Sequence, residues 1–335
     1  MEIRTEPLER DVFEAHGLIE EFPPIWRHPN KRVVYEIACP PGCAFAGEIR
    51  YSRWGPMTLP ETIDSGGASR LLDVREDHYD YAPEAGDLGA VEWHVNFADP
   101  HLFVAYGSAL MAQDEMQVAE HRALGALREA LTAKRHRAVT VDNGDPTPVL
   151  VMGVERRCRV ATDPNAAEGR PEGLYGNAFA HASEEAVRRA THRIDPPTIT
   201  NILTMSAPPG GNGRYRREEI EWILVTAFTG FRAAVLESTG RAAGMAPVVI
   251  HSGFWGCGAS GGHRVLMATL QILAAAMAGI HRLLFHAFDA AGTRALQEAR
   301  TLIQDELGGD RAIATADLIA RLHEKGFEWG VSDGN

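Results

Sequence analysis

Cysteine is scarce in this chain, and long apolar runs are missing. The 335 residues include only four cysteines, at uneven spacings: Cys39, Cys43, Cys158 and Cys257. They are too few and too scattered for a disulfide framework, so we expect free thiols in a cytoplasmic protein. No stretch of 18 apolar residues occurs, which predicts no membrane span. The charged segment Met1–Arg10 lacks the apolar core of a signal peptide.

Positive charge is also in short supply. Lysine and arginine number 33 against 45 acidic residues, which gives a formal net charge of -12. An acidic chain is poorly matched to nucleic-acid phosphates, so we expect no direct nucleic-acid partner. The net charge does not exclude a phosphorylated small molecule as a ligand, because backbone N–H groups can bind a phosphate locally. The adjacent Arg156 and Arg157 are interpreted as exposed.

Metal-binding patterns are absent as well. The histidines form no spacing typical of a zinc site, and Cys39–Cys43 (CPPGC) is neither the CxxC redox spacing nor half of a zinc pair. The sequence therefore predicts neither a metal nor another cofactor. It gives no indication of the oligomeric state.

Apolar strands and amphipathic helices alternate from about residue 70. The predicted strands are Val91–Phe97, Pro148–Val154, Thr198–Ser206, Pro247–His251 and His281–Phe288, and the predicted helices are Gln113–Arg135, Glu218–Ser238, His263–Ala278, 293–306 and 314–325. This order predicts one α/β domain at 70–335, with helices on both faces of the sheet. Residues 1–69 contain one strand-like stretch, Arg32–Ala38, and are predicted as an irregular N-terminal extension packed on the domain.

The strongest local signal is a glycine-rich loop between a strand and a helix. Five glycines occur within ten residues: Gly253, Gly256, Gly258, Gly261 and Gly262. Glycine permits positive φ and close backbone approach to a ligand, and the following helix offers free N–H groups. The loop lacks the Gly-Lys-Ser/Thr of a phosphate-binding Walker loop and the GxGxxG spacing. An ordinary strand-to-helix turn is the alternative, and the glycine density with Trp255 favours a ligand loop.

This loop resembles that of poly(ADP-ribose) glycohydrolases. Phe254–His263 (FWGCGASGGH) is similar to the family's NWGCGAFGGD, and Leu270–Ala276 resembles its LIQILAAA helix. Upstream, Val95–Asp99 (VNFAD) resembles VDFAN and Gln113–Glu115 (QDE) resembles the catalytic QEE. Further ordered similarities occur at Val149–Glu155, Leu174–Phe179, Arg217–Phe231 and Leu283–Phe288. The resemblance covers about residues 70–330 and implies a macrodomain-like three-layer fold with a mixed central sheet.

The departures from the family pattern fall on substrate-binding positions. Its first glycine triplet aligns with Phe103–Ala105, and its substrate-ribose Asn aligns with Asp99. In the glycine-rich loop, Phe254, Ser260 and His263 replace Asn, Phe and Asp. The residues at Phe103–Ala105 are not expected to allow the close backbone approach of three glycines. We therefore expect a substrate with a single ADP-ribose unit rather than the polymer.

The resemblance implies that Glu115 is the catalytic acid/base, protonating the atom that leaves C1 of a ribose and then activating water. The adjacent Asp114 is limited to positioning. Otherwise, both are simply acids at a helix N-terminus, where they favour the helix dipole. Asp99 is predicted to accept from ribose hydroxyls or to bind a cationic substrate. The substrate-binding set implied by the resemblance is Asp99, Gln113, Tyr175, Gly253, Trp255, Gly256, Cys257, Gly258, Gly261, Gly262 and Phe288; for Tyr175 and Phe288, core or loop packing is the alternative.

The activity implied by the resemblance is hydrolysis of the ribosyl C1 bond in an ADP-ribose derivative. The expected partner is an ADP-ribose-containing small molecule or an ADP-ribosylated substrate. Two other functions stay open. One is a biosynthetic enzyme that removes ADP-ribose or a related nucleotide part from an NAD-derived small molecule, and the other is a non-catalytic ADP-ribose-binding macrodomain.

Overall fold

The computed structural model describes residues 5–64, 67–84, 89–134, 136–239, 246–308 and 311–334. Its centre is a mixed eight-stranded sheet in the order β1-β2-β8-β9-β5-β10-β11-β4. The strands are β1 (Glu9–Glu14), β2 (Glu48–Arg53), β4 (Leu72–Arg75), β5 (Val91–Ala98), β8 (Val149–Val160), β9 (Thr191–Ser206), β10 (Val248–Ser252) and β11 (Arg282–His286). From β9 to β4 all neighbours are parallel, whereas β1, β2, β8 and β9 pair antiparallel.

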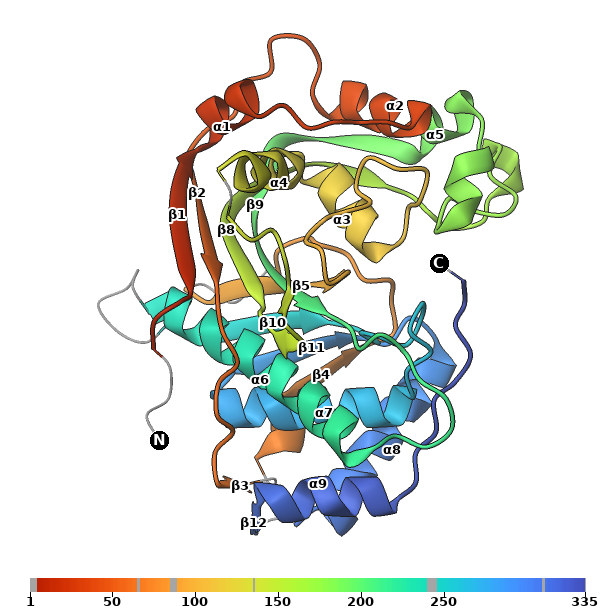
Figure 1. The fold of residues 1–335 in the computed structure, drawn as a ribbon. Helices are drawn as coiled ribbons and strands as arrows, with labels where there is room; N and C mark the ends of the chain where they lie inside the picture. Colours follow the sequence, from red (N-terminus) through yellow and green to blue (C-terminus); the bar gives the residue numbers. More distant parts are fainter. Residues whose placement is uncertain are drawn as a thin grey trace.

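Helices cover both faces of this sheet (Figure 1). One side carries α6 (Arg217–Thr239), α7 (Arg264–Ala278), α8 (Ala290–Glu306) and α9 (Thr315–Glu324). The other carries α1 (Ala15–Glu21), α2 (Pro29–Ala38), α3 (Gln113–Glu120), α4 (Ala123–Ala133) and α5 (Glu184–Ala190). Each side has its own buried apolar cluster. The predicted α/β class with a mixed sheet between two helical layers is confirmed.

Two small two-stranded sheets lie outside the central one. One pairs β3 (Thr62–Asp64) with β12 (Ala312–Ala314), and the other pairs β6 (Val141–Asp142) with β7 (Asp145–Pro146). Within the described residues, no helix has the length and apolarity that crossing a bilayer requires.

The first 69 residues differ from the irregular extension that we predicted. β1 and β2 extend the central sheet, with β2 paired to β8. The predicted strand at Arg32–Ala38 is wrong, because this stretch lies within α2. Pro29 begins that helix, and Asn30, Val33, Val34 and Ala38 are buried at helical spacing. The separation of 1–69 from 70–335 stays a prediction.

Three neighbouring parallel strands determine where a site can form. β9, β5 and β10 end at Ser206, Ala98 and Ser252, and each ends at the same edge of the sheet. The loops that follow them therefore lie together. Ligands bind in crevices outside the carboxyl ends of such strands in open α/β sheets.

Candidate active site

A pocket of about 540 Å³ opens at this edge of the sheet. The end of β5 and the loop after it supply 97–100, the loops after β9 and β10 supply 207–209 and most of 254–260, and α3 contributes its first residues. Among the predicted site residues, the pocket brings together Asp99, Gln113, Asp114, Glu115, Tyr175, Gly256 and Gly258. Its size falls within the range of small-molecule sites.

The side chain of Gln113 links the start of α3 to the end of β5 through hydrogen bonds. Its Oε1 accepts from the Phe97 N–H at 2.7 Å, and its Nε2 donates to the Val95 carbonyl at 3.1 Å. The same Nε2 lies 3.3 Å from the Tyr81 hydroxyl. Gln113 thus fixes the position of the two residues that follow it, although we predicted it as a substrate-binding residue.

Asp114 and Glu115 are nearly buried at the first turn of α3, with exposures of 6% and 4%. Asp114 accepts from Asn96 Nδ2 at 3.0 Å, which explains its orientation toward β5. Glu115 lines the pocket, and its Oε2 has no hydrogen-bond partner within the described part of the chain. The two adjacent carboxyls therefore differ, because Asp114 is held by the protein and Glu115 keeps an oxygen unengaged.

Burial controls the ionisation of this pair. Desolvation raises the pKa of Asp114, and the neighbouring Glu115 raises it further. Desolvation likewise raises the pKa of Glu115, against the opposing effect of the Lys31 ammonium group. A carboxyl with a raised pKa can hold a proton near neutral pH, which suits a general acid.

The glycine-rich loop presents to the same pocket N–H groups without a backbone acceptor among the described residues. Within the described residues, the N–H groups of Gly256, Gly258, Ala259 and Ser260 donate to no backbone acceptor, and all four residues line the pocket. The dipole of α7, which begins at Arg264, adds a positive end to the same region. This loop can bind an anion without a cationic side chain.

The backbone conformation of the loop requires glycine at particular positions. Gly256 has φ of 75°, and a Cβ there would lie 3.0 Å from Met267 Cε. Gly261 has φ of 65°, and its Cβ would lie 2.7 Å from the Gly330 carbonyl oxygen. The second contact shows that part of the glycine pattern serves packing within the protein.

A segment near the end of the described chain lies across this loop. Gly330 N–H donates to the Gly261 carbonyl at 2.7 Å, and Asn177 Nδ2 donates to the Gly334 carbonyl at 2.9 Å. Between them, Asp333 lines the pocket, and its Oδ2 lies 2.9 Å from where a Cβ on Gly258 would be. A carboxylate therefore stands beside the N–H groups that would receive an anion.

Asp99 and Tyr175 both line the pocket. The Asp99 side chain is 49% exposed and its Oδ1 accepts from the His101 N–H at 2.8 Å. Tyr175 is 43% exposed. Both side chains are therefore accessible to a bound molecule, and their predicted part in substrate binding stays a prediction.

Other predicted site residues do not line the pocket. Trp255 is completely buried in the apolar core, where its Nε1 donates to the Met205 carbonyl at 3.2 Å. Phe288 is 57% exposed and packs against His78, with ring centroids 4.4 Å apart. The remaining members, which support the loop from outside the pocket lining, are Gly253, Cys257, Gly261 and Gly262.

Phe103, which occupies the first position of the family's glycine triplet, keeps a backbone conformation that favours glycine. Its φ is 52°, in the left-handed region that favours glycine, and its side chain is completely buried. This conformation costs roughly 1–2 kcal/mol for a residue with a Cβ, and burial of the aromatic ring offsets it. Phe103–Ala105 contribute nothing to the lining of the pocket.

Two residues near the site could not be predicted from the sequence. Lys31 reaches the start of α3 from α2, in a region that we predicted as irregular. Asp333 reaches the glycine-rich loop through a segment that has no recognisable motif. Both positions depend on packing between parts of the chain that are far apart in the sequence.

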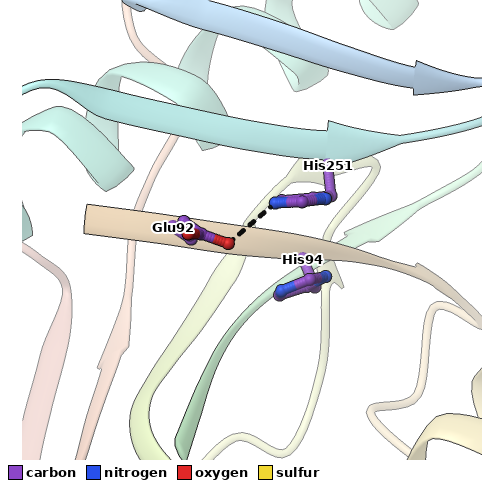
Figure 2. A group of neighbouring side chains, drawn as sticks. All are labelled: Glu92, His94 and His251. Atoms are coloured by element: carbon purple, nitrogen blue, oxygen red, sulfur yellow. Dashed lines mark hydrogen bonds and ion pairs between the residues drawn. The ribbon is translucent and has the colours of Figure 1, made fainter. Parts of the chain in front are cut away.

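Glu92, His94 and His251 cluster on β5 and β10 (Figure 2). One atom of each lies within 4.8 Å of the others, and His251 Nε2 lies 3.0 Å from Glu92 Oε2. The two imidazoles are stacked, with centroids 4.2 Å apart and planes 19° apart. Because the nitrogen lone pairs lie in these nearly parallel planes, they do not converge on one point. The group is a hydrogen-bonded stack, and binding a metal would require an imidazole to rotate.

Comparison with known proteins gives one family. Residues 172–295 match the model described as poly(ADP-ribose) glycohydrolase (PARG), Macro domain fold, which confirms the predicted resemblance and fold for this part. The glycohydrolase from Thermomonospora curvata bound to the inhibitor ADP-HPD has 17% identity and a TM-score of 0.46, covering 81% of this chain and 99% of that one. The enzyme from Deinococcus radiodurans in complex with ADP-ribose has 12% identity and a TM-score of 0.40, covering 89% and 95%. No curated protein matches the sequence.

Proposed function

We propose that the chain is a glycohydrolase, because residues 172–295 match the model of the poly(ADP-ribose) glycohydrolase family with its macro domain fold. Its reaction is hydrolysis of the ribosyl C1 bond in an ADP-ribose derivative. The observation that carries the proposal is Glu115, a buried carboxyl that lines the pocket with one oxygen unengaged. The raised pKa of this carboxyl supports an acid/base role.

One carboxyl suffices for both proton transfers. Protonated Glu115 donates its proton to the oxygen or nitrogen that leaves C1 as the glycosidic bond breaks. The resulting carboxylate then accepts a proton from the water that attacks C1, which leaves a C1 hydroxyl on the ribose and Glu115 protonated again. Asp114, which accepts a hydrogen bond from Asn96, positions this group.

The surroundings support a diphosphate-containing substrate that is bound mainly by backbone groups. The side chains of Asp99, Asp114, Glu115 and Asp333 line the pocket, whereas no lysine, arginine or histidine of the described residues does. The N–H groups of the glycine-rich loop are therefore the groups available to a diphosphate. The family's three glycines are replaced by Phe103–Ala105, which do not line the pocket, so the close backbone contact that three glycines allow is missing here. We therefore propose a substrate with a single ADP-ribose unit rather than the polymer.

The test is turnover by the full chain. Mono-ADP-ribosylated protein, poly(ADP-ribose) and NAD-type nucleotides are incubated with the parent chain, Glu115→Gln and the exposed control Glu172→Gln. We expect release of ADP-ribose from a mono-ADP-ribosyl substrate, and a loss of about 10²–10⁴ in kcat with Glu115→Gln only. Turnover that persists in Glu115→Gln overturns the acid/base role. Tight ADP-ribose binding without any turnover replaces the glycohydrolase with a binding module.

A further inference from the structure

Lys31 is a buried cation in the part of the chain that precedes the family match. It lies in the first turn of α2 and is 1% exposed. Its Nζ donates to the main-chain carbonyl of Glu115 at 3.3 Å, and it lies 5.6 Å from the centroid of the Phe179 ring. A lysine is rarely buried to this extent without an anionic partner.

The acidic groups that act on Lys31 are the two carboxyls of the proposed site. Burial lowers the pKa of Lys31 to about 7, while Glu115 and then Asp114 act in the opposite direction. Lys31 in turn lowers the pKa of both carboxyls. Lys31, Asp114 and Glu115 are all buried around the start of α3, so the charge on each of them affects the pKa of the other two.

Of the elements that pack against α2, only α3 provides carboxyls that act on Lys31 within the described residues. α2 packs against α3, α5, β8 and β9, and in the described chain the charged groups acting on Lys31 are Glu115 and Asp114. Desolvation and then Lys31 lower the pKa of His28, which caps the same helix, and Asp99 acts to raise the pKa of both carboxyls. Lys31 is thus the positive member of a cluster that is otherwise acidic.

Hydrogen bonds from Asn30 fix the position of α2, and with it the position of Lys31 beside Glu115. Asn30 Nδ2 donates to the carbonyls of Phe179 and Ala182, at 2.9 and 3.0 Å. The segment that ends in these residues includes Tyr175, which lines the pocket. The first turn of α2 therefore connects the start of α3 with the wall that carries Tyr175.

We propose that Lys31 is a positioning residue of the site: its buried ammonium group holds the main chain at Glu115 and supplies the positive charge that Asp114 and Glu115 share. This inference rests on the proposed function for its catalytic consequence, but not for its electrostatic one. It also gives residues before the family match a direct part in the chemistry.

Two variants separate the charge from the hydrogen bond. Lys31→Met removes both, and Lys31→Gln removes the charge but leaves a polar side chain with a hydrogen-bond donor. Lys325→Met is the matched control, because the ammonium group of Lys325 pairs with Glu306 at the surface. The carboxyl ¹³C signals of Asp114 and Glu115 are titrated in each full-length protein, with assignment by Asp114→Asn and Glu115→Gln. The pH profile of kcat/KM is measured beside them.

We expect both Lys31 variants to shift the carboxyl titrations to higher pH by about one unit or more, because a nearby positive charge is lost. The limb of the pH profile that reports carboxyl ionisation shifts in the same direction, and kcat/KM falls by about tenfold or more. Lys325→Met leaves all three unchanged. If Lys31→Met does not fold, Lys31→Gln carries the comparison.

The titration distinguishes the two proposals. Carboxyl titrations that stay in place in a folded Lys31 variant overturn the inference, even if activity falls. If the parent chain hydrolyses no substrate while the titrations shift as expected, the inference holds and the proposed hydrolysis fails.

Discussion

Arg156 on β8 donates from Nε to a carboxylate oxygen of Glu120 on α3 at 2.8 Å, and both side chains are almost fully buried, with exposures of 3% and 2%. Glu120 also accepts from the Val160 N–H at 2.8 Å. Burial raises the pKa of Glu120 to about 7, although Arg156 acts against this. The pair joins the end of the helix that begins with Glu115 to the central sheet, and so contributes to the position of the candidate active site.

Arg156→Met leaves a buried, unpaired carboxylate at Glu120. We expect a loss of about 3–5 kcal/mol in the free energy of unfolding, measured by denaturant unfolding at pH 8. The loss is smaller at pH 5, where Glu120 takes up a proton. The double variant Arg156→Met/Glu120→Met recovers most of the stability, and a single variant as stable as the parent at both pH values contradicts this account.

Asp114→Asn changes how stability depends on pH. Burial raises the pKa of Asp114 in the folded protein, so the folded state binds more protons than the unfolded state above about pH 4. The parent therefore loses stability as pH rises through this window, and the Asn variant loses less, because Glu115 and Glu120 still have raised pKa values. We expect Asp114→Asn to be more stable than the parent by on the order of 1–3 kcal/mol at pH 8, with a smaller difference at pH 5.

Thermal or denaturant unfolding across pH 5–8 measures this effect. The Asn amide still provides an oxygen for Asn96 Nδ2, so the main change is the lost ionisation. A constant difference between the two proteins at every pH would show that Asp114 is not held protonated by the fold.

Asp333→Asn removes a negative charge beside the N–H groups of the glycine-rich loop. Because like charges within a few Å repel, we expect ADP-ribose to bind about three- to tenfold more tightly at low salt. The gain decreases as salt screens the charge. Calorimetric titration measures both, with Glu328→Gln as an exposed acidic control in the same segment; equal affinities at low salt would place the anion elsewhere.

Gly261→Ala combines an unfavourable backbone conformation with a steric clash. Its φ is 65°, and the added Cβ would approach the Gly330 carbonyl oxygen to 2.7 Å. Gly213→Ala provides a matched comparison, since φ is 67° and no atom lies within 4 Å of its added Cβ. We expect a destabilisation of about 1–2 kcal/mol for Gly213→Ala and a larger one for Gly261→Ala, measured by thermal unfolding. Equal losses would show that Gly330 moves aside freely.

The sequence predicted those parts of the fold whose signals are local. The strand before the glycine-rich loop and the helix after it have clear apolar patterns, and the structure contains both, at Val248–Ser252 and Arg264–Ala278. The long helix predicted at Gln113–Arg135 is divided at His121 and Arg122 into α3 and α4. No glycine or proline marks that break.

The sequence also predicted much of the pocket, since the order of motifs brought Asp99, Glu115 and Gly256 together. It could not predict burial that depends on distant partners. Arg156 and Arg157 were predicted as exposed and are buried, because Glu120 and Glu155 neutralise them within the fold. Trp255 has the neighbours of a ligand-binding residue, yet it packs beneath the loop in the core.

The strand order has a consequence for synthesis of the protein. β5 pairs with β10 and β4 pairs with β11, so Trp93 lies beside Ile250 and Leu72 beside Leu283. Such long loops must close before their contacts stabilise anything, which slows folding. A nascent chain that has not yet released β10 from the ribosome exposes one edge of β5, an apolar strand prone to association with other chains. We therefore expect fragments that end before residue 248 to aggregate, because they lack β10 and leave that edge of β5 unpaired. The pocket can assemble only after both β9 and β10 have been synthesised.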